Sequence, residues 1–303
     1  MLNKGFSISL NGYPVKTKNF RWYMSTYYSV NLNKVQTDDA RNYNLNDYLN
    51  GTAVVSGQPI STFYSYKFLG LNPQNGAPMF DDWEDRWHLL QGKTLDEVVP
   101  MILVNSGTRD PKFSGDLNNT FTYKNWSLSL NFSYSLGSKV RLFEMYGPII
   151  NGISAAANVR EEFLDRWQVP GDEKYTVYPL IISPSSPDYE HYRLHYSAPQ
   201  RAVGPNSGVP AFANNVWQMY DDSDLRVVSG NYLKLQSLSF SYRLNDRLLR
   251  KTPFTQLSIS FNTHNCFTIS AKELRGQDPS QAGFADAGLS IRPSYTIGLN
   301  VSF

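Results

Sequence analysis

Apolar and polar residues alternate strictly over the last stretch of the chain, from 289 to 303. The odd positions are apolar or aromatic, whereas the even positions are mostly serine, threonine, asparagine or glycine. A period of two is typical of a β-strand with one apolar face and one hydrated face. The run is also longer than the average globular strand of about 5–6 residues.

The same alternation recurs along the chain. Between 126 and 137, for example, large apolar residues alternate with Ser, Asn and Gly. Within 227–244 the apolar phase shifts between Leu235 and Leu238, which predicts a β-bulge. We predict nine strands, at about 4–13, 19–33, 58–70, 77–83, 112–123, 126–138, 227–243, 254–267 and 289–303.

The predicted connections alternate in length. Short ones, such as 124–125, alternate with long ones at 34–57, 84–111, 139–226 and 268–288. Short turns on one side and long loops on the other are typical of an outer-membrane β-barrel. The pattern therefore predicts an all-β fold, an antiparallel transmembrane β-barrel in which 139–226 is a large extracellular loop.

The alternative fold is a soluble β-sandwich, such as a carbohydrate-binding module, whose strands also alternate. The predicted strands, however, reach the roughly 9–11 residues that cross a membrane. Aromatic residues such as Phe20, Tyr123 and Trp126 lie near strand ends, as in the aromatic girdles of barrels. Charged residues make up only 18% of the chain, against a usual ~25%. These observations favour the barrel.

Composition and motifs exclude several other classes. The net charge of +2 gives no strong field for nucleic acid. Cys266 is the only cysteine, so neither an internal disulfide nor a cysteine-based metal site is expected. The sequence has no G-x-S-x-G elbow, no P-loop and no G-x-G-x-x-G after a strand. We therefore expect no enzyme, no metal site and no cofactor.

The strand count bears on the extent of the protein. Bacterial single-chain barrels have an even number of strands, and a closed barrel leaves no strand edge bare in lipid. Nine is an odd number, and the chain begins without the pattern of a signal peptide. We therefore expect the chain to be the C-terminal part of a longer protein.

A series of short motifs runs through the chain in a fixed order. Asp165-Arg166-Trp167 with Pro170-Gly171-Asp172-Glu173 is one, and the stretch from Ser223 to Leu235 is another. The remaining ones are Gly57 to Pro78, Ser106 to Trp126, Gly276-Gln277-Asp278-Pro279 and Gly298 to Phe303. Together they cover almost the whole chain, and they resemble the SusC/RagA family of TonB-dependent outer-membrane transporters.

This resemblance implies the last nine strands of a 22-stranded barrel, with the signal, the TonB-contacting segment and the plug domain of the family absent. It also implies uptake of glycans or oligopeptides across the bacterial outer membrane. The implied partners are a SusD-like surface lipoprotein, outer-membrane lipid, the substrate, and the TonB complex through the missing N-terminal part.

The long loop 139–226 is rich in aromatic residues. Aromatic rings suit stacking on sugars or anchoring on a partner protein. We therefore take four of them as candidate ligand or partner contacts: Trp167, Tyr192, Trp217 and Tyr220. The alternative is that they pack a large folded loop.

An acidic run stands at the end of the same loop. Asp221, Asp222 and Asp224 cluster carboxylates, which are the ligands that Ca²⁺ prefers. Their spacing does not fit an EF-hand, and the alternative is solvated loop charge.

The chain ends on an aromatic residue that closes an alternating strand. Phe303, with Tyr295 on the same face, resembles the signal that the barrel-assembly machinery reads. The alternative is that Phe303 is the last aromatic of a membrane-interface girdle.

Overall fold

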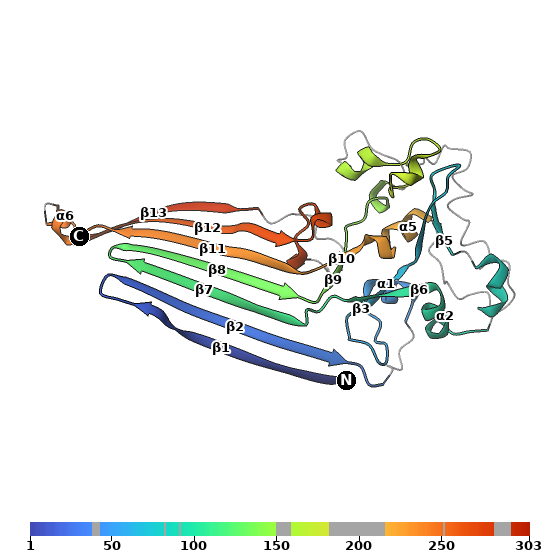
Figure 1. Ribbon diagram of the computed structural model, residues 1–303, viewed down its shortest axis with the longest axis horizontal. Coiled ribbons are helices and arrows are strands. Elements are labelled where there is room, and N and C mark those ends of the chain that lie inside the picture. Colours follow the sequence, from blue (N-terminus) through green and yellow to red (C-terminus); the bar gives the residue numbers. More distant parts are fainter. Residues whose placement is uncertain are drawn as a thin grey trace. The chain divides into compact units, whose positions relative to one another are not determined.

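The computed structural model describes residues 1–37, 43–81, 83–90, 92–149, 159–181, 216–250, 252–281 and 292–303. The chain divides into two compact units (Figure 1). Unit 1 consists of Met1–Asn33, Asp110–Val140 and Ser229–Phe303, and unit 2 consists of Lys34–Arg109 and Arg141–Val228.

Unit 1 is built on one seven-stranded sheet with the order β1-β2-β7-β8-β11-β12-β13. From β2 to β13 every neighbouring pair is antiparallel. The strands are β1 (Leu2–Lys16), β2 (Phe20–Lys34), β7 (Phe113–Tyr123), β8 (Trp126–Leu136), β11 (Tyr232–Arg243), β12 (Gln256–Ser270) and β13 (Ser294–Ser302). All seven coincide with predicted strands.

The register of the sheet gathers the apolar positions on one face. Side chains that are direct partners on neighbouring strands lie on the same face of a sheet. One such row crosses six strands and contains only apolar side chains: Ile297, Phe261, Phe240, Leu128, Phe121 and Trp22. The alternation read from each strand separately therefore adds up to one continuous apolar face.

The predicted bulge is confirmed. The register shifts between Leu235 and Ser237 in the pairing of β11 with both of its neighbours. On β12 the shift is matched near Asn265, which has a φ of 54°. The bulge keeps Leu235 and Leu238 on the apolar face despite their odd spacing.

Unit 2 is an irregular assembly of short elements. It contains α1 (Leu45–Asn50), α2 (Leu95–Ile102) and α5 (Val216–Asp221). Two small antiparallel sheets pair β3 (Thr62–Tyr66) with β6 (Leu103–Thr108) and β4 (Phe68–Leu71) with β5 (Pro78–Phe80). These elements surround a hydrophobic core that includes Tyr48, Tyr66, Val98, Trp217 and Tyr220.

For two of the nine predicted strands, the assignment to the large sheet is wrong. The segments 58–70 and 77–83 form β3, β4 and β5 in unit 2 instead. Every residue of β3 is buried, so this strand has no face for either lipid or water. Strand β6 was not predicted, because its segment was assigned to a loop. The large sheet of the described chain thus has seven strands.

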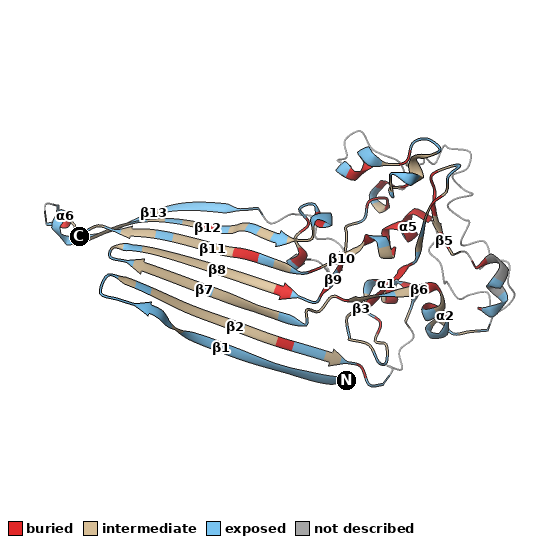
Figure 2. Ribbon diagram, viewed as in Figure 1, coloured by how far each residue is buried: buried red, intermediate tan, exposed pale blue. Residues whose placement is uncertain are grey.

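The distribution of burial differs between the units. In Figure 2 the strands of the large sheet are mostly intermediate or exposed, whereas buried residues concentrate in the elements of unit 2. Among the described residues no helix combines the length and the apolar character needed for a membrane span.

Candidate functional site

The apolar face of the large sheet is exposed. Ile297 and Leu299 on β13 are 79% and 63% exposed, and Ile259 and Phe261 on β12 are exposed as well. Burying a side chain of this size is worth about 1.5–3 kcal/mol. The described residues of unit 1 form a single sheet, so no second layer of that unit covers this face.

The opposite face carries small neutral polar groups that bond across the strands. Thr120 and Ser129 are joined by a hydroxyl–hydroxyl contact of 3.1 Å, and Ser239 donates to Asn262 Oδ1 at 2.6 Å. Gln236 Nε2 donates to Ser133 Oγ at 2.8 Å. Hydroxyls and amides can both donate and accept hydrogen bonds. This face is therefore a hydrated surface suited to polar, uncharged groups.

Aromatic rings line the end of the sheet where the short turns lie. Phe20, Tyr123, Trp126 and Tyr242 are successive register partners across four strands. The rings of Trp126 and Tyr242 have centroids 4.2 Å apart. Such a row fits the membrane-interface girdle of a barrel.

The two residues of the candidate assembly signal lie on the same apolar face. Tyr295 stacks on Phe261 with ring centroids 6.3 Å apart. Phe303, 84% exposed, packs edge-on against Phe254 at 5.2 Å. The structure brings them to the exposed face without testing the signal role, which stays a prediction.

A buried ion pair ties a loop to the hydrated face. Lys234 Nζ lies 2.8 Å from Asp278 Oδ2, and the two side chains are 3% and 9% exposed. Asp278 also accepts hydrogen bonds from the Ser280 N–H and hydroxyl. Burial raises the pKa of Asp278, but the bonds from Lys234 and Ser280 outweigh it and hold the pKa below its ordinary value.

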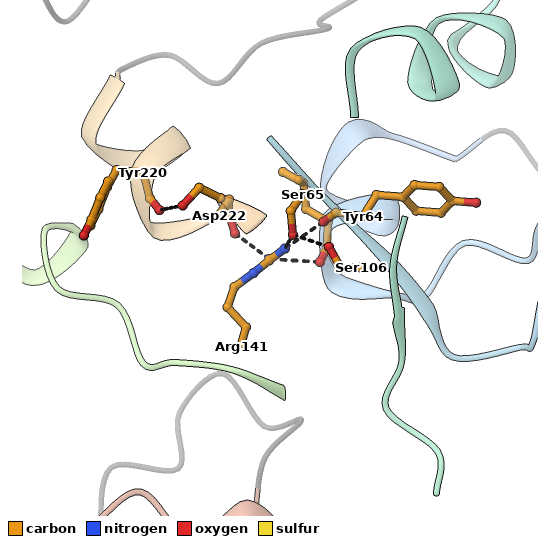
Figure 3. A network of polar contacts seen from close by, with 8 residues as sticks. Tyr64, Ser65, Ser106, Arg141, Tyr220 and Asp222 are labelled. Carbon is orange, nitrogen blue, oxygen red and sulfur yellow. Dashed lines mark hydrogen bonds and ion pairs between the residues drawn. The ribbon is translucent and has the colours of Figure 1, made fainter. Parts of the chain in front are cut away.

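In unit 2 a largely buried arginine connects segments that lie far apart in the chain (Figure 3). Arg141 pairs with Asp222 Oδ1 at 2.7 Å. Its guanidinium also donates to Leu49 O, Tyr64 O and Ser65 Oγ, and Ser106 donates to Ser65. Burial lowers the pKa of Arg141, and the Asp222 charge opposes that shift. The rigid fork of arginine suits such a junction.

Asp221 organises the neighbouring turn. Its carboxylate accepts the backbone N–H groups of Met145, Tyr146 and Gly147 at 2.8–2.9 Å. Burial raises its pKa, while the Arg226 charge and the three backbone donors act in the opposite direction. A buried carboxylate with this many donors fixes the backbone around it.

The aromatic residues predicted as contacts lie in the core. Trp167, Trp217 and Tyr220 are buried, and Trp217 Nε1 donates to Leu180 O at 3.1 Å. A Cβ at Gly76 would come within 2.3 Å of Trp167, so that glycine makes room for the indole. Buried rings cannot stack on a ligand, so this correction assigns the three to packing. Tyr192 lies outside the described residues.

The acidic run is not a cluster of free carboxylates. Asp221 caps backbone N–H groups and Asp222 pairs with Arg141, as described above. The Asp224 carboxylate accepts hydrogen bonds from Lys67 Nζ and from the Phe68 N–H, each at 3.0 Å. In the described part of the chain no group of three or more His, Cys, Asp or Glu residues is placed to hold a metal ion.

The organising role of Arg141 was not predicted. A single arginine in a long connection carries no motif, and its partners come from distant segments at 49, 64–65 and 222. A partial signal lies in the alternation of β3, because Ser65 occupies the polar phase of a strand that is buried throughout. A buried serine needs a partner, and Arg141 supplies it.

Known proteins resemble this chain in sequence and in fold. No protein-family model matches the chain. TonB-dependent receptor P3 of Formosa agariphila is 23% identical over 330 residues, which cover 99% of this chain and 28% of the receptor. TonB-dependent receptor P39 of the same organism is 21% identical and is matched over 30% of its length.

Solved structures show the same fold. The RagAB peptide transporter matches 99% of this chain and 29% of its own, with a TM-score of 0.63 and 16% identity. The RagAB peptide importer in its "open-open" state gives a TM-score of 0.61 and 18% identity. The chain therefore spans less than a third of the length of these relatives. In sequence and in fold it is SusC/RagA-like and is similar to a part of the TonB-dependent receptors.

Proposed function

We propose that this chain forms part of an outer-membrane transporter for TonB-dependent nutrient uptake. The seven-stranded sheet is a section of the barrel wall, with its apolar face against lipid and its hydrated face toward the lumen. The protein moves its substrate without making or breaking bonds in it. Supporting this, both sequence relatives are TonB-dependent receptors.

The exposed apolar face is the observation that carries the proposal. Rows of Ile, Leu, Phe and Trp side chains run across the sheet with no layer of unit 1 above them. In lipid these side chains need no protein cover, because hydrocarbon replaces it. The strands of 9 to 15 residues in this sheet match the length that crosses a membrane.

The rival proposal, a soluble β-sandwich that binds carbohydrate, fits the sheet less well. A sandwich buries the inner face of one sheet against a second sheet about 10 Å away. The remaining sheets in the described chain have two strands each, too few to cover seven. Three of the four candidate sugar-stacking rings, Trp167, Trp217 and Tyr220, are also buried.

We further propose a SusD-like surface lipoprotein as partner and glycans or oligopeptides as substrates. The described segment 159–181 of unit 2 supports the partner. Its backbone is fixed by Asp172, whose Oδ2 accepts the N–H groups of Gln168 and Val169 at 3.0 Å. From this framework Leu164 and Tyr175 project, 74% and 90% exposed. A rigid loop with exposed apolar side chains suits protein binding.

The RagAB structures are those of a peptide transporter, which supports oligopeptides among the substrates.

Lipid contact of one sheet face tests the transporter proposal. In the full-length protein with Cys266→Ser, Ile297→Cys and Thr296→Cys are labelled separately with bimane and reconstituted with brominated lipid. These neighbours lie on opposite faces of β13. We expect strong quenching at 297 and weak quenching at 296. Equal quenching at both positions would overturn the assignment of this sheet to a barrel wall.

A further inference from the structure

Basic side chains gather at one end of the large sheet. This end comprises the β1–β2 turn, the β7–β8 turn and the β11–β12 connection, which includes α6 (Asp246–Leu249). The set, here called the turn-end rim, consists of Lys16, Lys18, Lys124, Arg247 and Arg250, all exposed. Asp246 is the one acidic side chain in the described parts of these three connections. The rim therefore carries a strong excess of positive charge.

The rim borders the aromatic row at the same end. Lys124 directly follows Tyr123, and Lys18 precedes Phe20, so both lysines lie on the turn side of that row. The ammonium group of Lys124 lies 5.3 Å from the centroid of the Tyr123 ring, which belongs to the apolar face. Aromatic girdles lie at the level of the lipid headgroups. Cations just beyond them, on side chains that extend toward water, reach the level of the phosphates.

The α6 connection adds an amphipathic element to the rim. Leu249 is buried, whereas Leu248 is 56% exposed. Exposed Arg247 and Arg250 flank this leucine pair. An exposed apolar side chain among cations is the combination that settles at a membrane surface.

None of the five rim side chains takes part in an ion pair within the described chain. Their charge is therefore available to an external anion. We propose that the turn-end rim binds the phosphate groups of anionic phospholipids in the leaflet on the turn side of the membrane. This inference rests on the proposed function, because it needs the apolar face to lie in lipid.

Lipid selectivity of the full-length protein tests the rim. The protein is placed in nanodiscs of phosphatidylcholine with a minor fraction of phosphatidylglycerol, and the lipids retained on extraction are counted by native mass spectrometry. The test variant is Lys18→Gln, Lys124→Gln, Arg247→Gln and Arg250→Gln together. The matched control replaces four exposed lysines at the other end of the same strands: Lys4→Gln, Lys34→Gln, Lys112→Gln and Lys139→Gln.

We expect the unaltered protein and the control to retain phosphatidylglycerol selectively. The rim variant should lose selectivity by roughly fivefold for each cation that contacts a headgroup. Raising the salt concentration screens these charges, so it should weaken the retention of phosphatidylglycerol most in the proteins that retain it most. Equal retention of both lipids by the unaltered protein, or an equal loss in the control, would overturn the proposal.

Heat-modifiable migration in a gel, measured first on every variant, separates two kinds of failure. A folded, membrane-inserted protein without phosphatidylglycerol selectivity overturns the rim alone. A protein that never enters the membrane overturns the proposed function and the rim with it.

Discussion

At the scale of single residues, side-chain phase along a strand decides the environment. Thr296 and Ile297 are neighbours in sequence, yet they pair with Asn262 and Phe261 on opposite faces of the sheet. Both are exposed in the structure, so exposure alone does not separate them. Their chemistry does, because a hydroxyl suits the hydrated face and a branched alkyl chain suits lipid.

An arginine scan of two neighbouring positions tests this assignment. Near the bilayer midplane, Ile297→Arg should cost roughly 2–4 kcal/mol, because the charge would enter hydrocarbon. Thr296→Arg, the control, should have a small effect on the hydrated face. Chemical unfolding from lipid vesicles measures both. Equal losses of stability at the two positions would contradict the assignment.

The Arg141 junction gives a second prediction at this scale. Arg141→Met leaves the largely buried Asp222 carboxylate, 21% exposed, without its cation, and we expect a loss of up to about 3 kcal/mol in the stability of unit 2. The control is Arg86→Met, because the Arg86–Asp81 pair is exposed and such pairs contribute about 0–1 kcal/mol. Hydrogen exchange of unit 2 in the full-length protein measures the difference. Similar exchange in both variants would contradict the role of Arg141.

At the scale of elements, the strands of the large sheet were predicted within a few residues. In unit 2 the strand character of 58–70 and 77–83 was predicted, but these segments were assigned to the wrong sheet and β6 was assigned to a loop. The large sheet follows one rule, since a single apolar face repeats over every strand. Strand β3 shows the same alternation, but its polar Ser65 is buried and bonded to Arg141 and Ser106. Alternation cannot distinguish a hydrated polar residue from a buried one whose partner comes from a distant segment. In the same way, an aromatic residue in a long loop can be a ligand contact or a core side chain, and Trp217 and Tyr220 lie in the core.

The loop held by Lys234 gives a prediction of pH dependence. The folded pKa of Asp278 is lowered, so its stabilisation is present above the ordinary aspartate pKa of about 3.9 and is lost as the pH falls through the folded value. A spin label at Glu273→Cys, with Cys266→Ser, should stay immobile from pH 7 to about 5 and become mobile only below about 4. In Asp278→Asn the label should be mobile throughout. A mobile label at pH 6 in the protein that retains Asp278 would contradict the proposed role of the Lys234–Asp278 pair in holding this loop.

At the scale of the whole molecule, the structure combines a uniform sheet with one irregular unit that carries its most exposed apolar loop. The backbone at Tyr175 is held by a hydrogen bond from its N–H to Asp172 O at 2.8 Å, so less backbone freedom is lost on binding. Such a residue is suited to anchor a partner.

Loss of the Tyr175 ring tests the partner surface. Tyr175→Ala should weaken the binding free energy of the surface lipoprotein by roughly 2 kcal/mol or more if the ring is an anchor of the interface. Leu89→Ala, an exposed apolar residue elsewhere in unit 2, is the control and should have little effect. Affinity is measured between the purified full-length receptor and its lipoprotein. Unchanged binding of Tyr175→Ala would remove segment 159–181 from the interface.

The interleaving of the two units has a consequence for the order of assembly. Unit 2 is made from the connection between β2 and β7 together with the connection between β8 and β11. Once these connections fold together, the β7–β8 hairpin is the only sheet segment between them, and the ends of β2 and β11 are tethered to it. If unit 2 folds before the strands pair, the entropy of closing the two long connections is lost in that step. Early folding of unit 2 would in this way favour the pairing of the strands that its two segments connect.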